Sequence, residues 1–205
     1  LHVYQKSGLS LWKRPIVLGD GSANGIRCEL FSDSKSRRDK NNMLRLDLGI
    51  PENSNIIGFV GRLTKDKGVA NLVDSFRHIL KFLPRTYLLV IGPLETTDEI
   101  PENVRDQLIH HENIISAGYQ DNVAPYYHIM DVLALPSFRE GLPSVPLEAA
   151  ASGVPTMGFR ATGLVDAVID GETGKLVPLG DTDGFAYAVL EYLLNPSLRR
   201  EHGQN

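Results

Sequence analysis

The sequence predicts an α/β fold built on a Rossmann-like, doubly wound parallel sheet. Short, almost wholly apolar segments recur along the 205 residues, and their length is typical of strands that are buried on both faces. Amphipathic segments, with apolar residues at spacings of three and four, lie between them. The hydrophobic fraction of 42 % is large enough for a sizeable core. Strand and helix in repetition indicate the doubly wound architecture.

Six segments are predicted to be strands, at residues 16–18, 56–60, 87–91, 114–116, 132–135 and 155–158. Four segments are predicted to be helices, at residues 37–48, 69–83, 144–152 and 181–194, and Gly49, Pro84 and Pro196 mark three of the helix ends. In folds of this class, ligands bind beyond the carboxyl ends of the strands. The candidate site is therefore expected in the loops that follow the strands.

The chain is expected to divide at about residue 50. Residues 19–25 are rich in turn-forming residues, and residues 32–42 are polar and charged. We interpret residues 1–50 as an interdomain or approach segment that includes the first strand, and residues 51–205 as the folded body.

Composition excludes several classes of function. The formal net charge of −4 and the pI of about 5.9 do not favour a nucleic-acid partner. Cys28 is the only cysteine, which excludes an internal disulfide, favours a reducing, cytoplasmic compartment and fits an ordinary free thiol. No apolar run approaches the ~20 residues that span a bilayer, and the first residues do not resemble a secretory signal.

The loop after the strand at residues 56–60 carries the first candidate site. Gly61 and Gly68 permit a tight backbone, and a helix is predicted to begin just after Gly68. Arg62 offers a planar fork to phosphate oxygens, and Lys67 offers a mobile positive charge. A solvated basic turn is the alternative interpretation of the same spacing.

The segment at residues 136–155 carries a more specific pattern. A buried strand leads into a loop with Gly141 and Pro143, and a helix is predicted from Ser144. The free N–H groups around the start of this helix favour an anion. Glu140 and Glu148 would lie ~12 Å apart by helical rise, farther than the ~5–9.5 Å of a glycosidase pair. They suit the two ends of one extended ligand, and ordinary surface carboxylates are the alternative.

The remaining motifs of common enzymes do not occur. The six histidines lack the spacing of a metal site, the serines lack a Gly-x-Ser-x-Gly setting, and the chain has no Walker or G-x-G-x-x-G phosphate loop. We therefore expect neither a bound metal nor a cofactor.

Four ordered segments resemble the retaining glycosyltransferases of the GT4 group (glycosyl transferases group 1), which have the GT-B fold. Glu140 to Glu148 matches the E-x7-E signature of that group, and its phosphate-binding segment is similar to Gly61-Arg62-Leu63 followed by Lys67-Gly68. Residues 21–26 resemble its interdomain stretch, and residues 161–164 and 170–177 its closing segment. Asp166 stands where the family often has glutamate after proline.

The resemblance implies a role for each matching residue. Arg62 and Lys67 would hold the diphosphate of a nucleotide-sugar donor, Glu148 would bind the ribose, and Glu140 would meet the donor sugar as the catalytic residue. The donor-binding set comprises Gly61, Arg62, Lys67, Glu140, Gly141, Leu142, Pro143, Ser144 and Glu148. Pro143 has no N–H to donate. Such enzymes need no metal, because cationic side chains and a helix terminus offset the charge of the leaving diphosphate.

The resemblance also implies that the chain is the C-terminal, donor-binding domain of a GT-B enzyme, without the N-terminal acceptor domain and the last helices. The expected reaction moves a sugar, with a UDP-linked donor and hexosyl or N-acetylhexosaminyl transfer favoured, to a glycan or lipid-linked acceptor in polysaccharide biosynthesis. The expected location is the cytoplasm or the membrane periphery, with membrane contact through the missing parts only. A catalytically inactive GT-B partner and a GT-B sugar-nucleotide epimerase are the alternatives.

Overall fold

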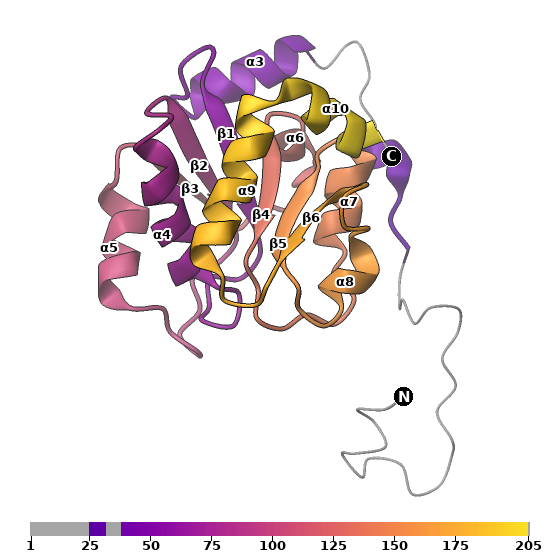
Figure 1. Cartoon of the computed structure of the whole chain (residues 1–205). Helices are drawn as coiled ribbons and strands as arrows, with labels where there is room; N and C mark the ends of the chain where they lie inside the picture. The colour runs from indigo at the N-terminus through magenta and orange to yellow at the C-terminus, as the bar shows by residue number, and fades with distance from the viewer. Residues whose placement is uncertain (1–24, 32–37, 205) are drawn as a thin grey trace, which may run out of the picture.

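The computed structural model describes residues 25–31 and 38–204, and its centre is one parallel β-sheet (Figure 1). The sheet contains six strands: β1 (Asn55–Val60), β2 (Thr86–Ile91), β3 (Ile114–Gly118), β4 (Val132–Leu135), β5 (Thr156–Phe159) and β6 (Gly174–Val177). Their order is β3-β2-β1-β4-β5-β6, and every neighbouring pair is parallel. The predicted fold class, a Rossmann-like doubly wound sheet, is confirmed.

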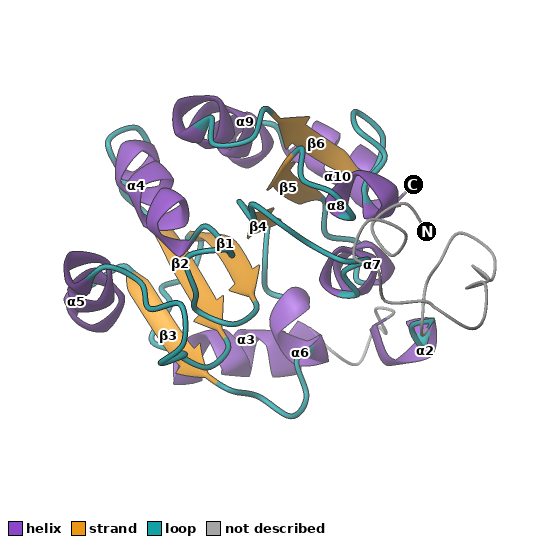
Figure 2. Ribbon diagram, turned by 90° about the horizontal axis from the view of Figure 1, so that it is seen from below, coloured by secondary structure: helices purple, strands orange, loops and turns teal. Residues whose placement is uncertain are grey.

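Helices cover both faces of the sheet. They are α2 (Cys28–Phe31), α3 (Arg38–Asp47), α4 (Val69–Leu80), α5 (Glu102–His110), α6 (Ala124–Tyr127), α7 (Val145–Ala151), α8 (Leu164–Ala167), α9 (Thr182–Leu194) and α10 (Pro196–Gln204). Figure 2 shows α4, α5 and α9 on one face and α6 and α7 on the other. Two-sided cover explains why the strands are apolar on both faces.

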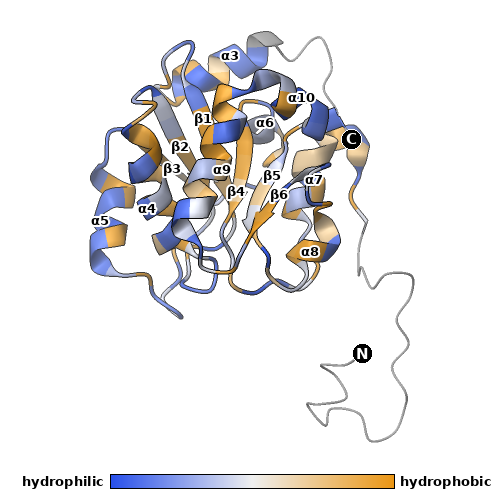
Figure 3. Cartoon of the chain, in the orientation of Figure 1, coloured by the Kyte–Doolittle hydropathy of each residue, from blue (hydrophilic) through white to orange (hydrophobic). Residues whose placement is uncertain are grey.

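The hydrophobic core lies on both sides of the central strands. Every residue of β4 and β5 is buried, and hydrophobic residues gather along the strands in Figure 3, whereas the outer faces of the helices are mostly polar. The residues of α4 at spacings of three and four pack onto the sheet, as predicted: Val69, Leu72, Val73, Phe76 and Ile79. Large aromatic side chains fill the rest, with Phe159 edge-to-face against Phe185 of α9.

All of the predicted elements that fall within the described residues are present with small shifts. Five strands and four helices match the predicted ranges within a few residues, whereas the strand predicted at residues 16–18 lies outside the described residues. The sequence did not predict β6, a four-residue strand that begins with Gly174 and contains a lysine. It also did not predict α5, α10 or the short helices α2, α6 and α8.

Residues just before the predicted boundary at residue 50 pack with the folded body. Ile50 is buried, and the partly buried side chains of Leu44 and Leu48 lie against the core. The boundary itself stays a prediction. Cys28 is an exposed free thiol.

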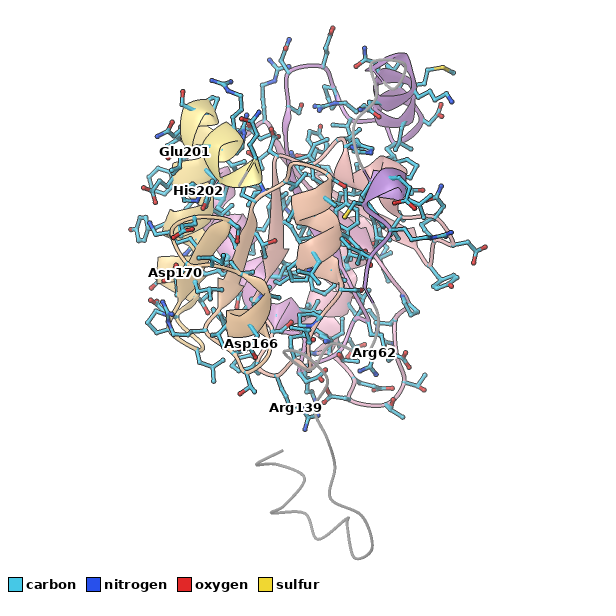
Figure 4. All side chains as sticks on the ribbon, turned by 90° about the vertical axis from the view of Figure 1, so that its right-hand side faces the viewer. Arg62, Arg139, Asp166, Asp170, Glu201 and His202 are labelled. Atoms are coloured by element: carbon cyan, nitrogen blue, oxygen red, sulfur yellow. The ribbon has the colours of Figure 1, made fainter. Side chains whose placement is uncertain are left out.

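The order of the strands changes direction between β1 and β4. The chain proceeds from β1 to β2 and β3 on one side, and from β4 to β5 and β6 on the other. The loops that follow β1 and β4 therefore leave the same edge of the sheet from neighbouring strands, which is where such folds bind ligands. In Figure 4, Arg62, Arg139 and Asp166 lie together at this carboxyl edge, whereas Glu201 and His202 lie toward the opposite end.

The last helix, α10, is held by polar contacts. Its Arg199 pairs with Asp131, just before β4, at 3.2 Å, and its His202 shares a 2.7 Å hydrogen bond with the buried Tyr192 of α9. No helix among the described residues is long and apolar enough to cross a bilayer.

Candidate functional site

Three loops at the carboxyl edge of the sheet are joined by backbone hydrogen bonds. The N–H of Phe138, after β4, donates to the carbonyl of Asp66, after β1, at 2.8 Å. The N–H of Glu140 donates to the carbonyl of Thr162, after β5, at 3.2 Å. The predicted segments at residues 61–68, 136–148 and 161–164 thus form one structural unit.

Two glycines allow these loops to approach one another closely. Gly68 has a φ of +68°, and a Cβ there would overlap the carbonyl of Pro136 at the end of β4. Gly163 has a φ of +80°, and a Cβ there would overlap the carbonyl of Gly141. Glycine is required at both positions because both the positive φ and the lack of space exclude a side chain. Gly68 and Gly163 therefore allow the close packing that positions the loops with the charged residues.

Lys67 and Glu140, predicted as separate ligand contacts, form an ion pair. The Lys67 Nζ lies 2.7 Å from the Glu140 Oε2, and the side chains are 18 % and 9 % exposed, respectively. This charge-assisted hydrogen bond links the loop after β1 to the loop after β4. Because both groups are largely buried, removal of either one leaves the other uncompensated. The sequence did not reveal this contact, since 73 residues separate the two partners.

Arg62 is exposed at the same edge (Figure 4). Its guanidinium makes no hydrogen bond or short ion pair with any described residue. Arg139, also at this edge, is 82 % exposed and lies 4.0 Å from Asp66. The edge therefore presents two exposed guanidinium groups, of which Arg139 makes a long ion pair with Asp66.

The loop that carries Lys67 is braced by polar residues that the sequence analysis did not single out. The Thr64 hydroxyl donates to the Asp66 carboxylate, and the N–H of Asp66 donates to the carboxylate of Asp98 at 3.0 Å. The bond from Thr64 holds the pKa of Asp66 below its usual value, and the charges of Lys67 and the nearby arginines act in the same direction, against the effect of burial. Asp66 thus stays ionised in the folded chain. Thr64 and Asp66 lie within the predicted segment, whereas no local signal identified Asp98.

Glu148 lies in the first turn of α7, as predicted, and its partner is a buried tyrosine. Its Oε2 accepts a 2.9 Å hydrogen bond from the Tyr127 hydroxyl at the end of α6. Tyr127 is fully buried, and burial, followed by the negative charge of Glu148, raises its pKa well above the usual value. Its hydroxyl therefore stays protonated and acts as a donor. The sequence analysis missed Tyr127 because nothing in its local pattern indicates this contact.

Between the two glutamates lies a short stretch of unused backbone donors. The N–H groups of Gly141, Leu142, Ser144 and Val145 make no hydrogen bond to any described residue. Glu140 is tied to the loop after β1, whereas Glu148 is tied to α6. An elongated anion could contact a lysine at one end, backbone N–H groups in the middle and a carboxylate at the other end.

The segment that resembles the closing segment of the family, at residues 170–177, supports the sheet. Asp170 accepts a hydrogen bond from the N–H of Leu176 in β6 at 2.9 Å and pairs with Arg160 after β5. Asp166 is exposed in α8 at the carboxyl edge (Figure 4), and its role stays open.

No group of three or more His, Cys, Asp or Glu side chains in the described part of the chain is placed to hold a metal ion. Independence from metal stays a prediction.

The chain therefore has a parallel doubly wound sheet with cationic side chains and two carboxylates in the loops and helix start at its carboxyl edge, which is where folds of this class bind ligands. The family model of glycosyl transferases group 1 matches residues 41–205, and the chain belongs to this family. The fold is that of the GT-B glycosyltransferases.

Known proteins agree with this assignment. The chain is 35 % identical over 205 residues to the capsular polysaccharide biosynthesis glycosyltransferase CapM of Staphylococcus aureus, covering all of this chain and 52 % of CapM. It is similar to the structure of Anabaena HepE in complex with UDP and glucose, with a TM-score of 0.77, 21 % identity and coverage of 89 % of this chain and 49 % of HepE. The structure of the C-terminal domain of a group 1 glycosyltransferase (LpcC) from Francisella tularensis is also similar, with a TM-score of 0.74, 22 % identity and coverage of 88 % of this chain and 94 % of that domain. The chain spans about half the length of the curated relatives it matches.

Proposed function

We propose that this chain binds the nucleotide-sugar donor of a retaining glycosyltransferase, with UDP as the nucleotide. The observation that carries the proposal is the line of complementary groups at the carboxyl edge. The groups are Lys67, the unused N–H groups among residues 141–145, and the Glu148 carboxylate in the helix that follows them. The UDP bound to HepE supports the choice of nucleotide.

Different residues of the candidate site would bind the diphosphate, the ribose and the sugar of the donor. Lys67, Arg62 and the backbone N–H groups of the loop after β4 would offset the negative charge of the diphosphate, both in the bound donor and as the leaving group departs. The Glu148 carboxylate would accept hydrogen bonds from the ribose hydroxyls. Glu140, beside Lys67, would meet the donor sugar. The acceptor would attack from the face that the nucleotide leaves, which retains the anomeric configuration.

The ion pair between Lys67 and Glu140 implies an exchange of partners when the donor binds. In the structure, the Glu140 carboxylate pairs with the Lys67 ammonium at 2.7 Å. An incoming diphosphate competes for the same ammonium group, and Glu140 becomes available to the hydroxyls of the sugar. Donor binding would thus prepare the carboxylate that the reaction uses.

The acceptor would be bound by the complete protein, because this chain spans about half the length of its curated relatives. We propose a glycan or lipid-linked acceptor and a hexosyl or N-acetylhexosaminyl donor, which the role of CapM in capsular polysaccharide biosynthesis supports. The single cysteine supports a reaction in the cytoplasm or at the membrane periphery.

A thermal unfolding screen tests the nucleotide. We expect UDP at one hundred times its dissociation constant to add about 2.7 kcal/mol of stability, or about 5–10 °C in the melting temperature of a chain of this size. GDP, ADP and uridine serve as controls for the base and the diphosphate. A screen in which no nucleoside diphosphate stabilises the chain would contradict the proposal.

Product analysis with the complete protein tests the reaction. A retaining transferase gives a glycosylated acceptor with the anomeric configuration of the donor. A nucleotide-linked epimer as the product would favour the epimerase, and the absence of both products would favour an inactive partner.

A further inference from the structure

The hydrogen bond between Tyr127 and Glu148 joins α6, which carries no proposed donor contact, to α7, which carries the proposed ribose ligand. Tyr127 ends the short helix α6, and Glu148 lies in α7, 21 residues farther along the chain. The ring of Tyr127 is fully buried and packs edge-to-face against Phe31 of α2, with 5.9 Å between the ring centroids. Its hydroxyl is therefore held in one place by the core.

That hydroxyl contacts one oxygen of the carboxylate and leaves the other available. Tyr127 donates to Oε2 of Glu148 at 2.9 Å, and its oxygen also lies 3.5 Å from the carbonyl of Val145. A tyrosine hydroxyl has a single proton, and an ionised carboxylate is the stronger acceptor. Oε1 of Glu148 has no hydrogen-bond partner among the described residues.

We propose that Tyr127 is the positioning residue that fixes the Glu148 carboxylate for the ribose of the donor. With Oε2 held by a buried hydroxyl, the carboxylate plane is fixed, and Oε1 is presented to a ribose hydroxyl without rotation of the side chain. A group fixed in advance binds more tightly because less side-chain freedom is lost on binding. This inference rests on the proposed function, in which Glu148 binds the ribose.

The environment of Tyr127 keeps its hydroxyl in the donating form. Burial and the charge of Glu148 raise the pKa of Tyr127 far above its usual value, so the phenol does not lose its proton. The hydroxyl has no other carboxylate partner among the described residues.

The test is Tyr127→Phe, which removes the hydroxyl and keeps the ring in its packing. We expect calorimetry on the 205-residue chain to show UDP bound about fivefold to tenfold more weakly, which is the size of the net contribution of one ordinary hydrogen bond. The affinity for 2′,3′-dideoxy-UDP, which lacks the ribose hydroxyls, should not change. Glu148→Gln should itself weaken UDP binding, and adding Tyr127→Phe to that variant should have little further effect.

Tyr192→Phe is the matched control. It removes a hydroxyl from another fully buried tyrosine, one that is bonded at 2.7 Å to His202, away from the carboxyl edge. We expect it to lower the melting temperature by a similar amount while the affinities for both nucleotides stay unchanged. This control separates positioning of Glu148 from a general loss of stability.

Each outcome decides between the two proposals. If Tyr127→Phe leaves UDP affinity unchanged, or weakens UDP and 2′,3′-dideoxy-UDP equally, Tyr127 does not position Glu148 for the ribose. If Glu148→Gln weakens UDP in the same experiment, only the role of Tyr127 is overturned. If the chain binds UDP but Glu148→Gln has no effect, the ribose role of Glu148 and the positioning role of Tyr127 both fail, while nucleotide binding stands. If the unaltered chain does not bind UDP, the proposed function itself fails.

Discussion

At the centre of the candidate site, Lys67 and Glu140 neutralise one another across 2.7 Å. The sequence predicted both residues as ligand contacts and assigned them to different parts of the donor. Their pairing couples these roles, because the charge of each residue determines how strongly the other interacts with a ligand. The effects of substitutions at the two positions should therefore depend on one another.

Removal of the lysine should reduce UDP affinity more than removal of the arginine. Lys67→Ala deletes a phosphate contact and also leaves the Glu140 carboxylate, only 9 % exposed, facing the diphosphate without compensation. We expect about a 100-fold loss for Lys67→Ala and about a 10-fold loss for Arg62→Ala, measured by calorimetry.

Lys65→Ala is the control for these variants, since Lys65 is an exposed lysine in the same loop. Its effect on UDP affinity should be less than threefold, as for an ordinary surface charge. Equal losses for Lys65→Ala and Lys67→Ala would show that only the general positive charge of the loop matters.

The two glutamates should give changes of opposite sign. Glu140→Gln removes the charge that competes for Lys67, so UDP should bind about twofold to fivefold more tightly. Glu148→Gln removes the proposed ribose acceptor, so UDP should bind more weakly. In the complete protein, Glu140→Gln should lower kcat, because a contact that strengthens in the transition state affects turnover. Changes of the same sign in UDP affinity would contradict this division of roles.

At the scale of the elements, the site depends on how closely three loops approach. The glycines that the sequence marks as turn signals, Gly68 and Gly163, have positive φ and lie against the backbone of a neighbouring loop. The sequence predicts the flexibility of such positions but not the neighbour that each one faces. That neighbour is decided by the order of the strands, which brings β1, β4 and β5 side by side.

Alanine at Gly163 should impair binding as well as stability. Gly163 and Gly171 have nearly the same positive φ, +80° and +82°, so alanine costs about 1 kcal/mol of stability at each for the backbone conformation alone. A Cβ at Gly163 also overlaps the carbonyl of Gly141, whereas one at Gly171 meets no atom within 4 Å. Unfolding in urea together with UDP titration should show weaker UDP binding for Gly163→Ala alone. Equal UDP affinity in the two variants would show that the Gly141 loop does not need this support.

Much of the candidate site could be predicted from the sequence because its candidate ligand-binding residues lie in two short segments. Residues 61–68 and 140–148 each follow a buried strand, and their spacing indicates charge beside a helix start. The supporting residues could not be predicted in this way. Tyr127 and Asp98 reach the site through tertiary packing, and their local sequence gives no signal of it.

At the scale of the whole molecule, the sequence predicted the fold class because strongly apolar strands and an amphipathic helix such as α4 are detectable one at a time. The elements it missed are short or weakly patterned. β6 contains an exposed lysine that pairs with Glu191 of α9, and α5 buries only two residues, Val104 and Leu108. These elements are stabilised by the packing of the completed sheet more than by local pattern.

The 205-residue chain should bind its donor without transferring sugar at the rate of a complete enzyme. It spans about half the length of its curated relatives, and orientation of the acceptor can contribute ~7–11 kcal/mol of barrier lowering. Incubation of the chain with UDP-sugars and an acceptor should give no measurable glycosylated product, beside slow hydrolysis of the donor. Transfer at a rate near that of the complete protein would contradict this expectation.

The crystal structure of the chain with UDP, grown in the presence of EDTA, tests the location of the donor site most directly. We expect the diphosphate beside Lys67 and the N–H groups of residues 141–145, with the ribose hydroxyls at Oε1 of Glu148 and the Lys67–Glu140 pair opened. UDP bound away from the carboxyl edge, or a diphosphate that leaves Lys67 paired with Glu140 and contacts neither the lysine nor the backbone of this loop, would contradict the proposed site.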